Sequence, residues 1–185
     1  MFLSLNIEPN IKDEFFAVQG KLADSLSHLP DRAVKWEDRL KYHITLFFLG
    51  DVEKNKMDSL ISKLDAFSKE LTLEEIFFKS THPECFPSSR NPRVIFADVE
   101  NEDRKSYELY DKLMPVLELE GFKPDKKFHL HITFGRVKFA GKLDIEKQIE
   151  NVNFNIEFSA KSFNLMQSIM DSRGSVYKVI KSFKI

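Results

Sequence analysis

The chain has 185 residues, of which 42% are hydrophobic, and this is enough for one domain with its own core. A formal net charge of −1 excludes an overall basic surface for wrapping long nucleic acid, although one nucleic-acid end can still enter a locally positive pocket. The single cysteine excludes an intrachain disulfide and fits a reducing compartment, so we expect a cytoplasmic protein. No apolar run is long enough to span a membrane, so no membrane partner is expected. We also expect a monomer.

Apolar periodicity predicts strands and helices that alternate along the chain. In chain order these are a strand at residues 2–7, a helix within 9–30, strands at 34–36 and 41–49, a helix at 57–67, strands at 73–79 and 93–99, a helix at 107–117, a strand at 128–137 and a short helix at 143–149. Two strands at 154–170 and 176–183 are expected to form a closing hairpin around residues 172–174. Residues 83–92 are rich in proline and are predicted to be a loop, in which Cys85 is structurally incidental.

The tripeptide His-Ile-Thr occurs twice, at residues 43–45 and 131–133, each time within a predicted strand. The copies are 88 positions apart (131 − 43), which is close to half the chain. This spacing predicts a single domain at residues 1–185 that contains two pseudo-symmetric α+β lobes. Because the chain has only four threonines, chance places one two positions after a given histidine about 2% of the time, so the repeated motif favours a functional site.

Alternation along a strand places the histidine and threonine of each copy on one face and the isoleucine on the other. If the two polar faces meet, one cleft holds the imidazoles of His43 and His131 and the hydroxyls of Thr45 and Thr133. A neutral imidazole can take a proton from an attacking water, and an imidazolium can give one to the leaving oxygen. Arg136 follows the second copy, and its planar guanidinium suits phosphate. These groups predict metal-independent hydrolysis of a phosphodiester.

Other polar residues near the motifs leave alternatives open. His129 shares the face of His131, and a His-x-His pair is compatible with zinc, but no neighbouring side chain completes a ligand set, so no metal or other cofactor is expected. Lys41 either reaches the cleft or stays in solvent. The basic run at residues 123–127 either steers a polyanion or is simply solvated. The chain contains no phosphate-binding loop, dinucleotide-binding motif or serine-hydrolase elbow.

Residues 42–50 (Tyr-His-Ile-Thr-Leu-Phe-Phe-Leu-Gly) and 130–136 (Leu-His-Ile-Thr-Phe-Gly-Arg) resemble the paired H-x-T signatures of the two-histidine (2H) phosphoesterase superfamily. The Phe-Leu-Gly that closes the first segment is similar to the branch of RNA 2′,3′-cyclic phosphodiesterases, also called 2′-5′ RNA ligases. The resemblance spans nearly the whole chain. Leu130 and Phe134 replace a proline and a leucine common in the family, and alternation places neither on the catalytic face.

This resemblance implies a bilobal α+β fold in which two antiparallel sheets flank a central cleft and the helices lie outside. The implied reaction opens 2′,3′-cyclic phosphates at RNA 3′ ends to leave 2′-phosphomonoesters, with weak 2′-5′ ligation in reverse. By motif position, His43 would be the general acid that expels O3′ and His131 the general base, although the pseudo-twofold symmetry makes these roles nearly interchangeable. Thr45, Thr133 and Arg136 would bind the phosphate.

The sequence leaves the substrate and two further interpretations open. The same site suits 2′-5′ linked oligonucleotides or small cyclic nucleotides, because specificity resides in residues around the cleft. A noncatalytic module that binds RNA ends is a further alternative, which the intact histidines and threonines disfavour. Phe48 either stacks on a nucleobase or packs into the core.

Overall fold

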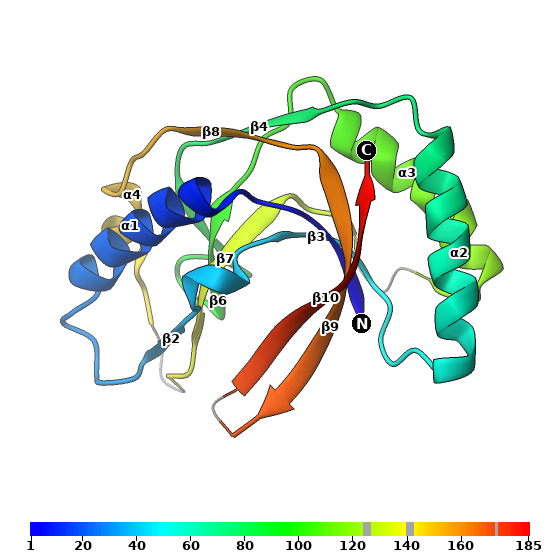
Figure 1. The fold of residues 1–185 in the computed structure, drawn as a ribbon. Helices are drawn as coiled ribbons and strands as arrows, with labels where there is room; N and C mark the ends of the chain where they lie inside the picture. The colour runs from blue at the N-terminus through cyan, green and yellow to red at the C-terminus, as the bar shows by residue number, and fades with distance from the viewer. Residues whose placement is uncertain (124–126, 140–142, 173) are drawn as a thin grey trace.

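The computed structural model describes residues 1–123, 127–139, 143–172 and 174–185 (Figure 1). In chain order its elements are β1 (Phe2–Leu5), α1 (Pro9–Ser25), β2 (Val34–Trp36), the 3-10 turn η1 (Arg39–Lys41), β3 (Ile44–Phe48), α2 (Lys54–Glu70), β4 (Ile76–Ser80), β5 (Pro83–Phe86), β6 (Val94–Asp98), α3 (Lys105–Leu119), β7 (His131–Val137), α4 (Glu146–Glu150), β8 (Ile156–Ala160), β9 (Ser162–Asp171) and β10 (Gly174–Lys184). Parts of two predicted features, residues 124–126 of the basic run and residue 173 of the hairpin turn, lie outside the described residues.

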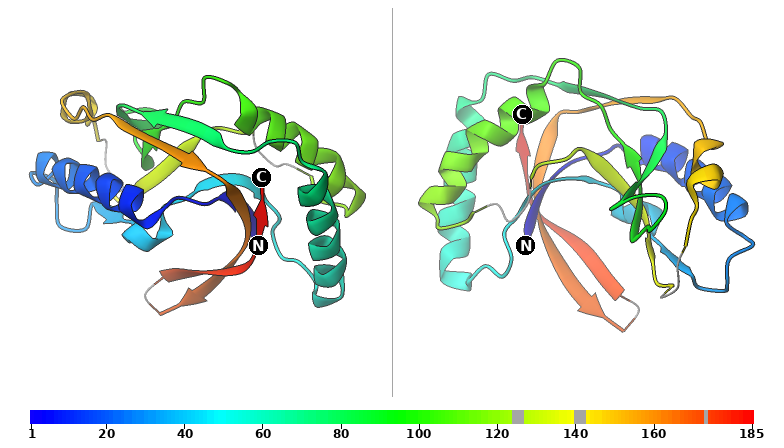
Figure 2. Two further views of the ribbon diagram at one scale, coloured as in Figure 1. Left: turned by 45° about the horizontal axis from the view of Figure 1, so that its top comes forward. Right: turned by 180° about the vertical axis from the view of Figure 1, so that it is seen from behind.

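The strands of the described residues form antiparallel sheets. Two sheets have four strands each, in the orders β10-β9-β1-β3 and β2-β7-β6-β5, and β4 pairs with β8 in a separate two-stranded sheet. Helices lie on the outside, with α1 and α4 at one end of the molecule and α2 and α3 at the other (Figures 1 and 2). The expected α+β class with two antiparallel sheets is confirmed, and the small third sheet was not expected from the sequence.

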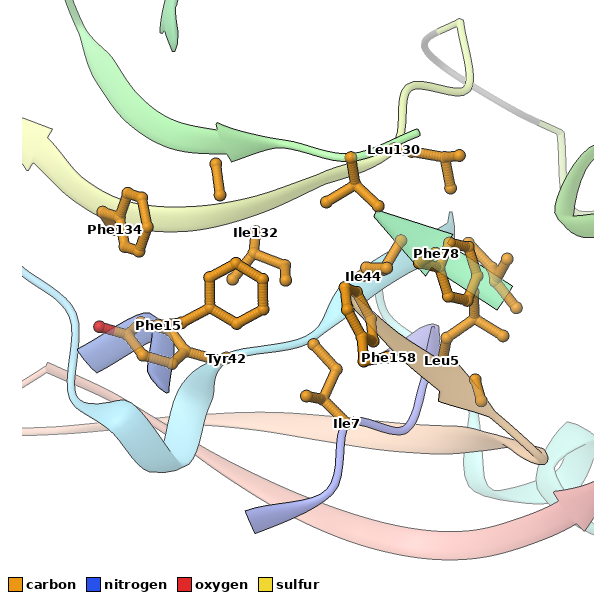
Figure 3. Packing of buried hydrophobic residues seen from close by; sticks show 14 of the residues in the cluster. Leu5, Ile7, Phe15, Tyr42, Ile44, Phe78, Leu130, Ile132, Phe134 and Phe158 are labelled. Carbon is orange, nitrogen blue, oxygen red and sulfur yellow. The ribbon is translucent and has the colours of Figure 1, made fainter. Parts of the chain in front are cut away.

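The histidine motifs belong to different four-stranded sheets and share one core. Ile44 and Ile132, the middle residues of the two motifs, are fully buried. They lie together in the cluster that Figure 3 shows, with Phe15 of α1 and Phe134 of β7 beside them. Alternation therefore works as expected at both motifs, because the apolar residue of each enters the core while the histidine and threonine stay partly exposed.

The predicted loop at residues 83–92 is wrong in its first half. Pro83–Phe86 forms β5, which pairs antiparallel with β6. β5 is an edge strand and Pro83 is its first residue, the position where a missing backbone N–H costs no ladder hydrogen bond. Cys85 is buried in this strand, and burial raises the pKa of its thiol to about 12, which leaves it unreactive at neutral pH.

Other predicted boundaries also needed correction. The strand expected at residues 41–49 begins only at Ile44, because η1 precedes it, so His43 lies just before β3. The strand expected at 154–170 is divided between β8 and β9, since the chain changes sheets at Lys161. The short helix expected at 143–149 is observed as α4, which begins three residues later, at Glu146.

The closing hairpin of β9 and β10 is confirmed, with strands paired from Gly174 and Asp171 to Lys184 and Ser162. Its inner half belongs to the four-stranded sheet, and its outer half projects beyond the rest of the molecule (Figures 1 and 2). None of the helices in the described residues is long and apolar enough to cross a lipid bilayer.

Candidate active site

A cavity of about 690 Å³ opens between the two four-stranded sheets. The six site residues expected from the sequence all line it: His43, Thr45 and Phe48 from the first motif segment, and His131, Thr133 and Arg136 from the second. The fold thus joins two segments that are 88 residues apart in one cavity (131 − 43).

The imidazole of His43 is held by hydrogen bonds on both ring nitrogens. Nδ1 lies 2.6 Å from the carbonyl oxygen of Lys41, and because a carbonyl can only accept, Nδ1 carries the hydrogen. In the neutral ring Nε2 is then the acceptor, and it lies 3.0 Å from the hydroxyl of Thr45. The pKa of His43 is lowered to about 4, mainly by burial and also by the nearby positive charges of Lys12 and Arg136, against the opposing hydrogen bond to Lys41.

His131 repeats this arrangement in β7. Its Nδ1 lies 2.9 Å from the carbonyl oxygen of His129, again two residues earlier in the chain, which fixes the same tautomer and leaves Nε2 without the ring hydrogen. Burial lowers the pKa of His131, and the charges of His129 and Arg136 act in the same direction. Both motif imidazoles are therefore neutral in the unliganded protein at pH 7, and each can accept a proton.

A β-bulge interrupts both motif strands directly after the threonine. In β3 the pairing passes from Ser4 with Thr45 to Leu3 with Phe47, so Leu46 is the extra residue. A bulge places two residues opposite one and reverses the alternation beyond it. Phe48 therefore lies on the cavity face with Thr45, whereas strict alternation would have turned it to the other face.

The bulge in β7 does the same for the arginine. The pairing with β6 passes from Phe96 with Thr133 to Ile95 with Gly135, so Phe134 is the extra residue and is fully buried. Arg136 thereby shares the face of Thr133 and lines the cavity. The arginine reaches the histidines only because of this irregularity, which the sequence analysis did not foresee.

Glu37 orients the cations of the site. Its carboxylate oxygens lie 3.6 Å from Nε of Arg136 and 3.7 Å from Nζ of Lys41, and its side chain is only 16% exposed. The backbone N–H of Glu37 donates to the carbonyl of the bulge residue Phe134 at 2.7 Å. Glu37 was missed in the sequence analysis, because it lies six residues before His43 (43 − 37), after β2 and outside both His-Ile-Thr motifs.

Aromatic rings enclose His43 on the side of the first sheet. The ring centroids of Phe2 and Tyr177 lie 5.0 and 5.4 Å from that of His43, and both residues line the cavity. Tyr177 was expected only as part of a C-terminal hairpin. Burial raises the pKa of its hydroxyl, which remains a hydrogen-bond donor at neutral pH.

The remaining sequence candidates have different positions. Lys41 and Lys123 line the cavity, whereas Lys127 and His129 border a second, largely aromatic cavity of about 540 Å³ that shares Phe48, Thr45 and His131 with the first. Nε2 of His129 lies 3.8 Å from a carboxylate oxygen of Asp98. Within the part of the chain that the structure describes, no three His, Cys, Asp or Glu side chains gather closely enough to hold a metal ion.

Phe48 lies at the junction of the two cavities. Its side chain is 52% exposed and its ring centroid lies 6.3 Å from that of Phe2. It is therefore not part of the core, and a planar group in the cavity can lie against it.

The chain is similar to known phosphoesterases over nearly its whole length. Residues 5–96 and 98–177 match the model of the LigT like Phosphoesterase family, and each matched segment contains one His-Ile-Thr motif. A protein of Methanocaldococcus jannaschii named RNA 2′,3′-cyclic phosphodiesterase is 30% identical over 189 residues, which cover 99% of each chain. A protein of Thermotoga maritima with the same name is 29% identical over 97% of this chain and 91% of its own.

Solved structures share the fold. TT0787 of Thermus thermophilus matches with a TM-score of 0.78 and 23% identity over 99% of this chain and 96% of its own. LigT of E. coli, solved in complex with 3′-AMP, matches with a TM-score of 0.75 and 19% identity over 100% of this chain and 96% of its own.

Proposed function

The chain belongs to the LigT like Phosphoesterase family, and on this premise we propose that it hydrolyses 2′,3′-cyclic phosphates at RNA 3′ ends to 2′-phosphomonoesters without a metal ion. The observation that carries the proposal is the pair of imidazoles in one cavity, each with Nδ1–H bound to a backbone carbonyl. Because this bond leaves Nε2 of each ring for proton transfer, one cavity contains an acid–base pair. The names of the relatives supply the substrate class.

In the proposed reaction a water oxygen attacks the phosphorus and the bond between phosphorus and O3′ breaks. His131 takes the proton of the water at Nε2, and His43 gives a proton to O3′, which leaves as the 3′-hydroxyl. Arg136 and the hydroxyls of Thr45 and Thr133 bind the nonbridging oxygens, whose negative charge grows as the water adds. In reverse the histidines exchange roles, which allows weak 2′-5′ ligation.

The substrate itself is proposed to charge the general acid. Both histidines are neutral in the unliganded protein at pH 7, because burial and neighbouring cations lower the pKa of each. A phosphodiester carries one negative charge, and an opposite charge within a few ångströms favours the protonated imidazole. Substrate binding therefore raises the pKa of His43, which takes up a proton from solvent at Nε2 and later gives it to the leaving oxygen.

The terminal nucleobase is proposed to stack on Phe48. The half-exposed ring and the largely aromatic second cavity beside it support this role, because aromatic side chains bind any base through its π face. We also propose that residues 1–185 act as one monomeric domain with two pseudo-repeat lobes, since a single chain contributes both histidines. The lone buried cysteine is compatible with a reducing, cytoplasmic location.

A substrate panel tests the proposal. Wild-type protein would be incubated with 2′,3′-cyclic mononucleotides, an oligoribonucleotide with a cyclic phosphate end, and a 2′-5′ linked dinucleotide, and the products would be separated into 2′- and 3′-phosphates. We expect 2′-phosphates from the cyclic substrates and full activity in EDTA. A 3′-phosphate product, or no product from any cyclic phosphate, would contradict the proposal.

A further inference from the structure

Lys35 lies next to the proposed phosphate-binding arginine, on the strand outside it. Lys35 of β2 pairs directly with Arg136 of β7, and β2 is the edge strand of that sheet. Directly paired residues on neighbouring antiparallel strands point to the same face. Val34 and Trp36 occupy the other face, since their atoms lie 2.9 and 3.0 Å from where a Cβ on Gly135 would stand. Lys35 is therefore on the cavity face, farther from the histidines than Arg136.

The tip of the β9–β10 hairpin lies against this lysine. A Cβ on Gly174 would stand 2.8 Å from Nζ of Lys35, although β10 and β2 belong to different sheets. The hairpin thus begins in the sheet that contains β3, and its tip reaches β2 at the edge of the sheet that contains His131. The outer half of the hairpin projects beyond the rest of the fold (Figure 2), and Ser168 and Tyr177 of the hairpin line the cavity.

The face of the hairpin that lines the cavity continues outward to the same tip. Ser168 and Tyr177 pair with each other and line the cavity. Two residues further along each strand, Met170 pairs with Ser175 on the same face. Met170 is 75% exposed. A strip of hydroxyls, one thioether and one ammonium therefore runs from the catalytic cavity to the hairpin tip.

Lys35 differs from the other two cations in having no carboxylate in direct contact among the described residues. Lys41 and Arg136 both face the carboxylate of Glu37, whereas Lys35 is exposed and forms no ion pair within the described ranges. The carboxylate of Asp171, at the end of β9, accepts a hydrogen bond from the N–H of Gly174 at 3.0 Å. An exposed ammonium beside a phosphate-binding arginine, along an open strip, suits a second phosphate of the same ligand.

We propose that Lys35 binds the phosphodiester that joins the 3′-terminal nucleotide to the preceding one, with Met170 in contact with the preceding nucleotide. This inference rests on the proposed function and adds a specificity determinant to it. Arg136 binds the cyclic phosphate that reacts, and Lys35 binds the next phosphate along the strand. The protein therefore prefers RNA ends to cyclic mononucleotides, which lack that second phosphate.

The test compares a cyclic mononucleotide, N>p, with a dinucleotide, NpN>p, in wild-type protein and the Lys35→Gln variant. We expect Lys35→Gln to lower kcat/KM for NpN>p about three- to fivefold, the scale of one exposed charge pair, and to leave N>p unchanged. The slope of log kcat/KM against log salt concentration should become shallower by about 0.7 for NpN>p, because one phosphate contact is lost. Lys35→Arg keeps the charge and should keep the preference.

A neutral methylphosphonate in place of the internal phosphodiester identifies the partner of Lys35. On this substrate, kcat/KM of wild-type protein should fall by the factor that Lys35→Gln causes on NpN>p. Lys35→Gln should not lower kcat/KM for this substrate any further. Lys54→Gln, an exposed lysine on α2, is the matched control and should behave as wild type. Three results for Lys35→Gln would overturn this inference while the proposed function stands. They are an equal fall in kcat/KM on N>p and NpN>p, no fall on either substrate, or a further fall on the substrate with the neutral linkage. Failure of wild-type protein to hydrolyse N>p and NpN>p would overturn both.

Discussion

Phe48 and Arg136 hold equivalent positions relative to the two His-Ile-Thr motifs. Each is five residues after its histidine (48 − 43 and 136 − 131), and each follows a β-bulge that comes directly after the motif threonine. The two motif strands therefore share an irregularity of pairing as well as the His-Ile-Thr sequence. The two bulges place an aromatic ring and a guanidinium on the cavity face at corresponding points, one suited to a base and the other to a phosphate.

Gly135→Ala tests the packing that supports Arg136. The added Cβ would lie 2.9 Å from Cγ1 of Val34 and 3.0 Å from Cε3 of Trp36, closer than these atoms can approach without a shift of β2 or β7. We expect a loss of about 1–3 kcal/mol in the free energy of unfolding, measured by urea denaturation, together with reduced activity. Val34→Ala removes one of the two clashing side chains. Gly135→Ala should therefore lower the free energy of unfolding less in the Val34→Ala variant than in wild-type protein. An unchanged midpoint in Gly135→Ala would contradict the packing argument.

Glu37→Gln tests whether Glu37 acts through Arg136. Arg136→Ala removes the phosphate-binding guanidinium, and we expect kcat/KM to fall about 100- to 1000-fold. Glu37→Gln leaves the guanidinium but removes the carboxylate 3.6 Å from its Nε, and a fall of about tenfold is expected. Residues that act as a unit are not additive, so the double variant should be no worse than Arg136→Ala. Additive losses would show that Glu37 acts independently of Arg136.

Histidine titration by NMR tests the charge state of the site. His43 should titrate with a pKa of about 4 and His131 below the ordinary value for histidine. Arg136→Gln removes a positive charge that lowers the pKa of both rings, so both should rise. Saturation with a 2′-nucleoside monophosphate should raise both in wild-type protein, since the anion favours imidazolium. A His43 pKa that stays near 6.5 in the free protein would contradict the assignment of two neutral rings.

Burial of neutral His43 also predicts how stability depends on pH. The unfolded chain binds a proton at this histidine near pH 6.5, whereas the folded protein does so only near pH 4. The unfolded state therefore binds more protons between these values, and stability falls as pH falls through this window, by at most about 1.4 kcal/mol per pH unit from this group. His43→Asn, which keeps a donor for the carbonyl of Lys41, should show a shallower dependence from pH 6.5 to 4. Exposed His28→Asn is the control, and a slope in His43→Asn equal to that of wild type would contradict the prediction.

The order of strands and helices was largely predictable from the sequence, because most elements present one apolar face to a shared core. The paired histidines and threonines were predictable for the same reason, since Ile44 and Ile132 had to be buried. The bulges at Leu46 and Phe134 were not, because a bulge depends on the pairing between two strands and not on the periodicity of one. Tyr177 was missed because it reaches the site from β10, a strand distant in sequence from both motifs. Glu37 is near His43 in sequence, but its contact with Arg136 arises only where β2 pairs with β7.

We propose that the two histidines, and no metal ion, carry out the reaction. The most direct measurement is the rate at which wild-type, His43→Ala and His131→Ala proteins hydrolyse an oligoribonucleotide with a 2′,3′-cyclic phosphate end in EDTA, with circular dichroism to verify folding. We predict full wild-type activity, losses of about 100-fold or more in each variant, and 2′-phosphate as the product. Wild-type rates in either folded variant, or loss of wild-type activity in EDTA, would contradict the account.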